Sequence, residues 1–397
     1  MAAQRAYSRR LRNCHNIDEL RRLAKRKLPF PIYDHIAGGA DDEVSLAANR
    51  HAFASYSLVP SQCAGLDEEE VDMSTQVLGR QLDWPVFSSP WGLQSIIHPH
   101  GELGLAAVVH ESGTAYGLSA FSEVPLETVA QQSRSGPLFF QLQPARSREM
   151  MGDMIDRARA AGFDALILTV DNPTHGNRER DLRSGLGFPP SFSLASWLSI
   201  AMRPGWALSK VGYEMQFANY TQYLDSPQRD IEWLFHELLY STDWTTVRWV
   251  AERWGGPMAI KGILSADDAR RAVDAGLSAV IVSNQGARHF DCSPAPLEVL
   301  PEIVAAVGDD VEVILDGGIR RGTDALKALA LGATACSTAR PFAYGLAAGG
   351  RDGARRALEL LNSEIARDMV FLGKRTLVDL NRDDLRVRTS STISTRW

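Results

Sequence analysis

The sequence predicts an α/β protein built as a (β/α)8 barrel. Short, strongly apolar segments recur along the chain, and an amphipathic segment follows each of them. The 397 residues, 45% of them hydrophobic, suffice for one large barrel, although length alone also fits two or three ordinary domains. Continuous apolar strands that alternate with helices favour a closed barrel over a doubly wound sheet. The predicted strands cover residues 85–89, 114–120, 137–142, 164–170, 257–261, 278–283, 311–316 and 334–339.

Helices are predicted between these strands because apolar residues recur there at helical spacing. Ser265 precedes one such segment and is suited to cap its first turn, since a serine hydroxyl accepts hydrogen bonds from free N–H groups. Gly162 and Gly276 follow two segments and are typical of helix ends, where the backbone becomes left-handed. The clearest predicted helices cover residues 148–162, 265–276 and 323–333.

Two parts of the chain lie outside the repeating pattern. Residues 1–60 have helical spacing and are predicted to form a cap beside the barrel, so that 1–397 is a single domain. Connections after barrel strands usually have about 2–6 residues, so the stretch 172–256 after the fourth strand carries an insertion. Its aromatic, weakly charged part, 193–215, suits a membrane surface or packing on the barrel or a neighbouring subunit. We favour packing.

Composition and charge exclude several classes of protein. Lys and Arg number 42 against 48 Asp and Glu, and this net charge of -6 lacks the basic field of a nucleic-acid-binding protein. The four cysteines, Cys14, Cys63, Cys292 and Cys336, form no C-x-x-C pair, so neither a zinc site nor a disulfide framework is expected. No apolar run reaches the ~18 residues of a membrane span, and no signal peptide is recognisable. We therefore predict a cytoplasmic protein without a metal centre.

The ends of the seventh and eighth predicted strands carry an anion-binding pattern. Active sites of such barrels lie at the C-terminal ends of the strands, and phosphate often binds after strands seven and eight. The seventh strand runs into Gly317 and Gly318, and paired glycines let backbone N–H groups approach an anion. Arg320 follows this pair, and Arg340 follows the eighth strand. Two adjacent strand ends that carry arginines indicate a phosphate site.

Polar side chains gather at three other strand ends. Lys261 ends the fifth strand within an apolar run, where an inward lysine can stabilise a developing anion or act as a nucleophile. The fourth and sixth strands end in the polar runs 169–172 and 283–291. Arg178 and Arg288 lie after or within these runs and are suited to hold a carboxylate bidentately. Together these residues predict a site for a phosphorylated cofactor and an anionic small-molecule substrate.

Five motifs occur in an order typical of one known family. They are LPFPIYDHIAGGADDE at 28–43, LTVDNP at 168–173, KGILSADDAR at 261–270, SNQGAR at 283–288 and LDGGIRRGTDALKALALGA at 315–333. The chain resembles the FMN-dependent α-hydroxy acid oxidase and dehydrogenase family, which includes glycolate oxidase, flavin-type lactate dehydrogenases and mandelate dehydrogenase. The resemblance runs nearly end to end and implies a barrel that binds FMN and assembles as a homo-oligomer, in this family a tetramer. It is much less specific for the substrate.

The resemblance also implies which residues bind FMN. Lys261 would lie near flavin N1, where positive charge favours the reduced, anionic flavin. Ala339 stands where the family usually has glycine, which alters the approach of the backbone to the phosphate. The implied FMN-binding residues are Pro90, Gly92, Ser119, Gln141, Thr169, Lys261, Ser283, Asp316, Gly317, Gly318, Arg320, Ala339 and Arg340.

The same resemblance implies that the acid–base residues are altered. Gln285 occupies the position of the family's catalytic histidine, and Gln143 and His35 occupy the positions of two active-site tyrosines. The residues that remain are Asp171, which would have oriented that histidine, and the clamp arginines Arg178 and Arg288. The carboxylate clamp is thus retained while the base is lost.

Loss of the base leaves three explanations open. Glutamine cannot accept a proton at neutral pH, so oxidation of a 2-hydroxy acid needs another base, for which His35 is a candidate. Alternatively the substrate is an amine, whose neutral form already has the lone pair that drives hydride loss. Third, the barrel binds flavin with lost or non-oxidative activity. We favour an enzyme, because a decayed site has no reason to keep two costly cations beside Asp171.

The predicted activity is FMN-dependent oxidation of a carboxylate-bearing small molecule by hydride transfer to flavin N5. The substrate is expected to be 2-hydroxy acid-like or derived from an amino acid, as in biosynthetic tailoring. We expect the catalytic residues to be His35, Gln285, Asp171 and Lys261, with substrate contacts from Gln143, Arg178 and Arg288.

Four further residues are candidates for the pocket. His289 follows Arg288, and strand-like alternation would turn it away from the side on which Arg288 points, so a structural role is expected. His175 is better placed as a substitute base. Trp91 and Phe121 stand where they can wall the flavin or the substrate with apolar area.

Overall fold

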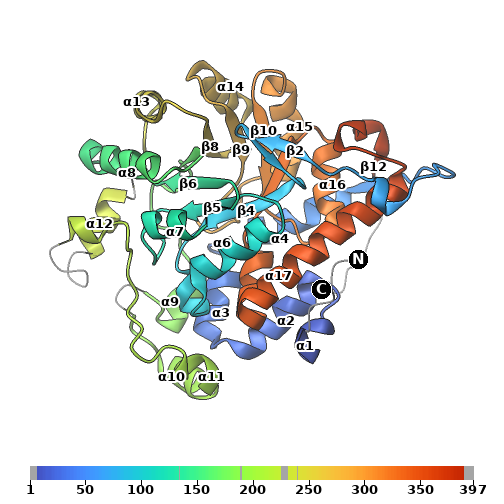
Figure 1. The fold of residues 1–397 in the computed structure, drawn as a ribbon. Helices are drawn as coiled ribbons and strands as arrows, with labels where there is room; N and C mark the ends of the chain where they lie inside the picture. The colour runs from blue at the N-terminus through green and yellow to red at the C-terminus, as the bar shows by residue number, and fades with distance from the viewer. Residues whose placement is uncertain (1–6, 134, 188–189, 225–230, 239, 389–397) are drawn as a thin grey trace.

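The computed structural model describes residues 7–133, 135–187, 190–224, 231–238 and 240–388. Its centre is a closed barrel of eight parallel strands (Figure 1). Successive strands are neighbours, and the last strand pairs with the first. The predicted (β/α)8 fold is therefore confirmed, and every predicted strand overlaps one barrel strand. These strands are β4 (Val86–Trp91), β5 (Tyr116–Ser119), β6 (Leu138–Leu142), β7 (Ala165–Thr169), β8 (Met258–Ile263), β9 (Ala279–Val282), β10 (Glu312–Asp316) and β11 (Ala335–Thr338).

Helices surround the barrel, as Figure 1 shows. Ser265 caps one of them by accepting a hydrogen bond from the N–H of Asp268, as predicted. Gly162 and Gly276 have φ angles of 84° and 76° just beyond two helix ends, in the left-handed region that favours glycine. The helices that follow the strands are α5 (Gln94–Ile97), α6 (Gly101–Glu111), α7 (Leu126–Gln132), α8 (Arg148–Ala160), α13 (Trp244–Trp254), α14 (Ala266–Asp274), α15 (Pro296–Val307), α16 (Gly322–Ala330) and α17 (Arg340–Leu372).

A hairpin closes the N-terminal end of the barrel. Its strands, β2 (Thr75–Val77) and β3 (Arg80–Leu82), pair antiparallel. Val77 and Leu82 belong to the same buried cluster as Phe87, Phe139 and other inward side chains of the barrel strands. The N–H of Leu78, at the turn, donates to the carboxylate of Glu312, the first residue of β10. The hairpin fills this end of the barrel, and the cavity described below lies at the opposite end, at the C-terminal ends of the strands.

The N-terminal segment is largely helical, as predicted. Its third helix lies against the insertion helix α9 (Glu179–Ser184) and carries His35. A strand not foreseen in this segment, β1 (Tyr56–Leu58), pairs antiparallel with β12 (Leu385–Val387), so the end of the N-terminal segment lies against the C-terminal end of the described chain. The helices are α1 (Arg9–Arg12), α2 (Ile17–Lys27), α3 (Phe30–Ala37), α4 (Val44–His51) and η1 (Ala52–Ser55), and the remaining short turns are η2 (Glu68–Glu70), η4 (Leu377–Asp379) and η5 (Arg382–Asp384).

The insertion after β7 leaves the barrel and returns to it. Phe217 and Tyr220 are buried against the barrel, whereas the helices at 194–208 extend away from it (Figure 1). No helix in the described part of the chain is long and apolar enough to cross a membrane. The elements between β7 and α13 are α9, α10 (Leu194–Ala201), α11 (Pro204–Leu208), η3 (Thr221–Tyr223) and α12 (Ile231–Leu238).

Helix α10 buries serines and exposes apolar side chains. The hydroxyl of Ser196 donates to the carbonyl of Ser184, and that of Ser199 accepts from the N–H of Phe30. Leu194 is 86% exposed and Leu198 60% exposed. The predicted packing of residues 193–215 on the barrel is confirmed for Trp206, whose indole donates to the carbonyl of Ile96 on α5 at 2.9 Å. It does not extend to this face of α10, because the hydrogen bonds of the two serines turn the apolar side chains outward. Cover by a neighbouring subunit stays a prediction.

Candidate active site

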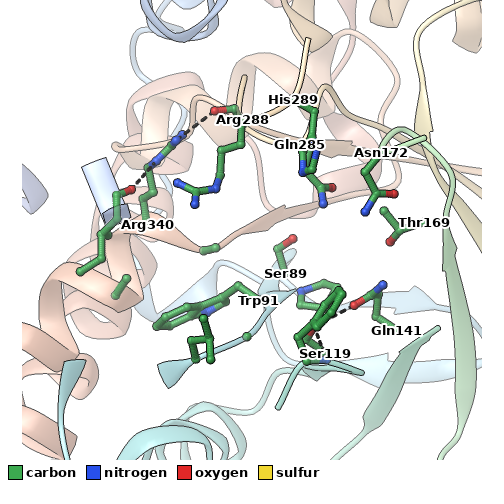
Figure 2. A pocket seen from close by; sticks show the side chains of 18 of the residues that line it. Ser89, Trp91, Ser119, Gln141, Thr169, Asn172, Gln285, Arg288, His289 and Arg340 are labelled. Carbon is green, nitrogen blue, oxygen red and sulfur yellow. Dashed lines mark hydrogen bonds between the residues drawn. The ribbon is translucent and has the colours of Figure 1, made fainter. Parts of the chain in front are cut away.

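A cavity of about 280 Å³ lies at the C-terminal ends of the barrel strands (Figure 2). Side chains from α3, from the insertion and from the loop after β9 complete its walls. Trp91 and Phe121 line it, as predicted. The other predicted site residues that line it are His35, Pro90, Gly92, Ser119, Gln141, Gln143, Thr169, Arg178, Lys261, Gln285, Arg288, Asp316, Gly317, Gly318, Arg320, Ala339 and Arg340. Ser283 and Asp171 are the two predicted site residues that do not.

Ser283 lies beneath the cavity floor and is fully buried. The ammonium of Lys261 donates to its hydroxyl oxygen at 3.0 Å, and this hydroxyl donates to Oδ2 of Asp316 at 2.7 Å. The Lys261 ammonium is also 3.1 Å from that carboxylate oxygen. Burial alone would raise the pKa of Asp316, but Lys261 and the hydroxyl donors Ser283 and Ser337 hold it below its usual value. Ser283 therefore positions Lys261, and its direct contact with FMN stays a prediction.

The cavity wall is strongly cationic. Its lining includes five cationic side chains, Arg178, Lys261, Arg288, Arg320 and Arg340, but one carboxylate, that of Asp316. Burial, followed by the repulsion of Arg178, lowers the pKa of Arg288 to about 9. Burial likewise lowers the pKa of Arg320 to about 10. Buried cations without matching anions are costly, so an anionic ligand would stabilise this wall.

The glycines after β10 are needed for the shape of the cationic wall. Gly317 and Gly318 have φ angles of 123° and 80°, which glycine adopts without strain. A Cβ on Gly318 would collide with the carbonyl oxygen of Asn49. The pair thus brings the backbone close to α4 and places Arg320 in the cavity wall.

Arg340 and Arg288 converge on the backbone of the N-terminal segment. Arg340 donates through Nη2 to the carbonyls of Gly38 and Gly286, both at 2.9 Å, and through Nε to that of Ile36 at 3.0 Å. Arg288 donates to the carbonyl of His35 and, at 3.5 Å, to that of Gly38. Part of each guanidinium therefore anchors α3 to the barrel, a role that the sequence did not indicate.

Asp171 lies behind the cavity, beside β8. Both carboxylate oxygens are buried and have no hydrogen-bond partner in the described part of the chain. Its Cβ lies where a side chain on Gly262 (φ 106°) would be, so only glycine fits beside it. Burial raises the pKa of Asp171 to about 6, although Lys261 acts in the opposite direction. The residue predicted to orient a base therefore has nothing to orient here.

His35 borders the cavity from α3 and contacts an acid of the insertion. Its Nδ1 is 2.9 Å from Oδ2 of Asp181, and Arg178 is 3.6 Å from the same oxygen. Burial lowers the pKa of His35 to about 4, with Arg288 and Arg178 acting in the same direction and Asp181 against them. The imidazole is thus neutral at pH 7. Asp181, which the sequence reasoning missed, is brought to His35 only by the packing of α9 on α3.

Gln143 is held by a second residue that was missed, Asn172. The two amides exchange hydrogen bonds of 2.9 and 3.0 Å, and both side chains are buried. Gln143 also donates to the carbonyl of Leu238, at the end of α12, at 3.3 Å. Its orientation is therefore fixed by the insertion. Asn172 lies within the polar run 169–172 and within the LTVDNP motif, which was the available signal for it.

Aromatic side chains wall another part of the cavity. Phe121, after β5, packs edge-on against Phe217 with ring centroids 5.4 Å apart, and Phe217 and Phe235 are 6.0 Å apart. The ring of His175 lies 5.3 Å from that of Phe235. His175 therefore lines the cavity against an aromatic ring. Phe217 and Phe235 belong to the insertion and carried no recognisable signal in the sequence.

His289 lines the cavity together with Arg288, so the prediction that it turns away is wrong. Alternation of side chains requires extended backbone, but Gln285, Gly286 and Ala287 have φ angles of 53°, 62° and 60°. Figure 2 shows His289 beside Gln285, across the cavity from Ser119 and Gln141. Burial lowers the pKa of His289 to about 3, so the ring is neutral.

Comparison with known proteins identifies the family of this chain. A model of FMN-dependent dehydrogenases matches residues 24–387. The chain belongs to this family. It is 38% identical to a peroxisomal (S)-2-hydroxy-acid oxidase of Oryza sativa subsp. japonica, over 92% of this chain and 94% of the relative. It is 35% identical to (S)-mandelate dehydrogenase of Pseudomonas putida, over 94% of each chain. The resemblance predicted from the motifs is therefore confirmed.

Solved structures of the FMN-dependent dehydrogenases agree with the fold. A crystal structure of the monotopic membrane protein (S)-mandelate dehydrogenase superimposes with a TM-score of 0.90 at 34% identity, over 95% of this chain and 100% of the other. As a member of this family the chain is an FMN-dependent oxidoreductase, and the prediction of an FMN enzyme is confirmed.

The residues present fit FMN. The family cofactor carries a phosphate, and the excess of buried cations in the cavity wall requires an anion. Helix α17 also begins at the cavity, where Ala339 is its N-cap, and a helix N-terminus favours negative charge. Among the residues described, no group of three or more His, Cys, Asp or Glu side chains could hold a metal ion.

Proposed function

We propose that the protein oxidises a carboxylate-bearing small molecule, a 2-hydroxy acid or a related 2-amino acid, with FMN as the electron acceptor. The observation that carries this proposal is the cationic cavity. Lys261 pairs with Asp316 and Arg178 with Asp181, but Arg288, Arg320 and Arg340 form no ion pair among the described residues, which is more positive charge than one phosphate dianion needs. When bound, FMN supplies the acceptor for the hydride that leaves Cα of the substrate. A biosynthetic tailoring reaction suits the altered polar residues of the pocket.

FMN would be held mainly by the cationic wall and the strand ends. Arg320 and Arg340, with the backbone of Gly317 and Gly318, would bind its phosphate. Lys261 would place positive charge beside the flavin ring, since Ser283 and Asp316 fix its ammonium. Polar groups at the other strand ends, those of Ser119, Gln141 and Thr169, would add hydrogen bonds, and Pro90, Gly92 and Ala339 would add backbone contact.

The substrate carboxylate would bind between Arg178 and Arg288, which line the cavity beside His35. Removal of the hydroxyl proton then falls to His35, because its neutral imidazole can accept a proton while the amide of Gln285 cannot. Gln285 would instead position the substrate, together with Gln143. Asp171 would contribute negative charge from behind the cavity floor.

An absorbance spectrum followed by anaerobic titration with 2-hydroxy and 2-amino acids tests the proposal. We expect a yellow protein whose flavin bleaches with at least one carboxylate-bearing substrate. With that substrate, His35→Ala should lower the rate of flavin reduction by at least ~10² for an alcohol and only modestly for an amine. A protein that binds FMN but is reduced by no member of either class would favour the alternative, a flavin-binding homologue with lost or non-oxidative activity.

Assembly and location are proposed from the sequence. We propose a homo-oligomer in which the exposed apolar face of α10 and α11 is covered by a neighbouring subunit, since Leu194, Trp197 and Leu208 are each more than half exposed. A sedimentation experiment on Trp197→Ser in an otherwise intact chain should show a smaller assembly than wild type. Sedimentation of wild type with anionic lipid vesicles would instead favour a membrane surface. A cytoplasmic location is supported by the four cysteines, all of them free thiols.

A further inference from the structure

Asp181 and His35 come from distant parts of the chain and meet behind the cavity wall. Asp181 lies on α9 of the insertion and is 6% exposed, whereas His35 lies on α3 and borders the cavity. We propose that Asp181 is a positioning residue that orients the imidazole of His35 and stabilises its protonated form, so that the two act as a carboxylate–imidazole dyad. This inference rests on the proposed function with a hydroxyl-bearing substrate.

The hydrogen bond between the two residues determines the tautomer of His35. Burial alone would raise the pKa of Asp181, but the hydrogen bond with His35 and the charge of Arg178 hold it below its usual value. Asp181 is therefore a carboxylate, which can only accept, so Nδ1 of the imidazole must carry the hydrogen over the 2.9 Å contact. A neutral imidazole then has its lone pair on Nε2. In the part of the chain that the structure describes, no residue hydrogen-bonds to Nε2.

This arrangement suits proton transfer from the substrate. The hydroxyl O–H bond breaks and its proton goes to Nε2 of His35, while the two electrons of the Cα–H bond leave with the hydride, as in the proposed function. The substrate becomes a 2-oxo acid, and His35 becomes an imidazolium beside the carboxylate of Asp181. The carboxylate offsets the repulsion from Arg178 and Arg288, whose charges oppose protonation of the ring.

The structure also offers a matched control. Asp34 is the residue before His35 on α3, and its carboxylate lies 3.6 Å from Arg180 of α9. The Asp34–Arg180 pair thus joins the same two helices as the Asp181–His35 pair, but Asp34 does not line the cavity. Loss of the Asp34 charge should weaken the packing of α3 on α9 without changing the tautomer of His35.

The test compares Asp181→Asn, Asp34→Asn, His35→Gln and the double variant Asp181→Asn/His35→Gln in the FMN-loaded protein. With the substrate found in the screen, Asp181→Asn should lower the rate of flavin reduction by about 10² and move the acid limb of kcat/KM to lower pH. The double variant should be no slower than His35→Gln, because Asp181 acts through His35. Asp34→Asn should keep the wild-type rate within a few fold.

The results that would contradict the proposed function differ from those that would contradict the Asp181–His35 dyad. If no substrate reduces the flavin, the proposed function is wrong. If His35→Gln is slow and Asp181→Asn keeps the wild-type rate and pH profile, the dyad is wrong while the proposed base is retained. Independent losses that add in the double variant would also overturn the dyad.

A second measurement needs no substrate. In protein labelled with ¹⁵N at histidine, nuclear magnetic resonance should show His35 as the Nδ1–H tautomer in wild type and in Asp34→Asn. Asp181→Ala should shift the ring toward Nε2–H, the form that a free histidine side chain prefers. A wild-type ring in the Nε2–H form, or a tautomer that does not respond to Asp181→Ala, would overturn the inference.

Discussion

The ammonium of Lys261 donates a hydrogen bond of 3.0 Å to Oε1 of Gln285. The amide is held in this orientation by its own backbone, because Gln285 has a φ angle of 53° and its N–H donates to Ser283 at 3.0 Å. Gln285 is therefore a fixed polar contact of the lysine, with its Nε2 group left as a donor toward the cavity. This geometry explains how a side chain that cannot act as a base occupies the centre of the site of an FMN-dependent oxidoreductase.

Restoring a histidine at this position tests how far the pocket has changed. A positioned base contributes roughly 10²–10⁴ in rate, and the carboxylate of Asp171 has no hydrogen-bond partner among the described residues. We expect Gln285→His to raise the turnover of glycolate, lactate or mandelate by less than ~10². The reason is that Gln143, which occupies the position of a family tyrosine, is fixed by its hydrogen bonds with Asn172 and cannot hold the substrate as a tyrosine would. Steady-state kcat/KM on the three acids measures the gain. Full activity from the single change would contradict a reshaped pocket.

Retention of FMN should depend on the cationic wall. The guanidinium of Arg320 hydrogen-bonds only to the carbonyl of Ile319 among the described residues, so Arg320→Ala removes charge from the cavity with little other loss. We expect FMN to dissociate roughly 10–100 times more readily, as measured by the recovery of flavin fluorescence on dilution. Its neighbour Arg321, which pairs with Glu364 at 2.8 Å outside the cavity, provides the control, and Arg321→Ala should retain FMN normally.

Lys261 and Arg340 should matter more for flavin than Gln285. We expect Lys261→Ala and Arg340→Ala to weaken FMN retention or reducibility more than Gln285→Ala, because each removes a buried charge rather than an amide. Arg340→Ala also frees the carbonyls of Ile36, Gly38 and Gly286, so its thermal stability is measured alongside. Equal effects of the three variants on FMN content would place the phosphate site elsewhere.

The pH dependence of the rate should reveal the base. Burial lowers the pKa of His35 to about 4, so for an alcohol substrate kcat/KM of the free enzyme should fall only as pH drops toward 4. For an amine substrate the rate should instead rise with pH as the ammonium loses its proton. Stopped-flow reduction of the flavin between pH 4 and 9 distinguishes the two, and a flat profile would contradict both.

Glu123 should make the stability of the fold depend on pH. It is 6% exposed, accepts a hydrogen bond from the N–H of Ile96 at 3.2 Å and contacts the hydroxyl of Tyr213 in the insertion. Burial, followed by the negative charge of Glu102, raises its pKa from 4.5 to about 7. The folded chain therefore holds a proton that the unfolded chain releases between these pH values. The free energy of unfolding should thus fall as pH rises from 4.5 to 7.

Replacing this carboxyl with an amide should remove that dependence. From pH 5 to pH 8, Glu123→Gln should lose on the order of 2 kcal/mol less stability than wild type, measured by urea unfolding. Glu127→Gln, at a half-exposed position paired with Arg157, should leave the wild-type fall in place. An identical fall in wild type and Glu123→Gln would show that Glu123 does not hold the proton.

The sequence by itself determined the barrel and its cationic strand ends. Strands such as β7 are continuous apolar runs in the sequence because both their faces are buried. The glycine pair and Arg320 follow β10, and Arg340 follows β11, which is the neighbouring strand. Side chains at the ends of neighbouring strands must share one edge of the barrel. Their convergence therefore follows from local pattern and topology, which a single sequence carries.

Only the tertiary structure decided what surrounds these strand ends. Asp181 meets His35, and Asn172 and Leu238 fix Gln143, because the long insertion folds back on α3 and on the barrel. His289 enters the cavity because three residues with left-handed φ break the alternation expected of a strand. Helix α10 turns its serines inward against its apolar pattern. Each of these outcomes depends on contacts between segments distant in sequence or on single dihedral angles. The hydrophobic periodicity of the chain encodes neither the contacts nor the angles.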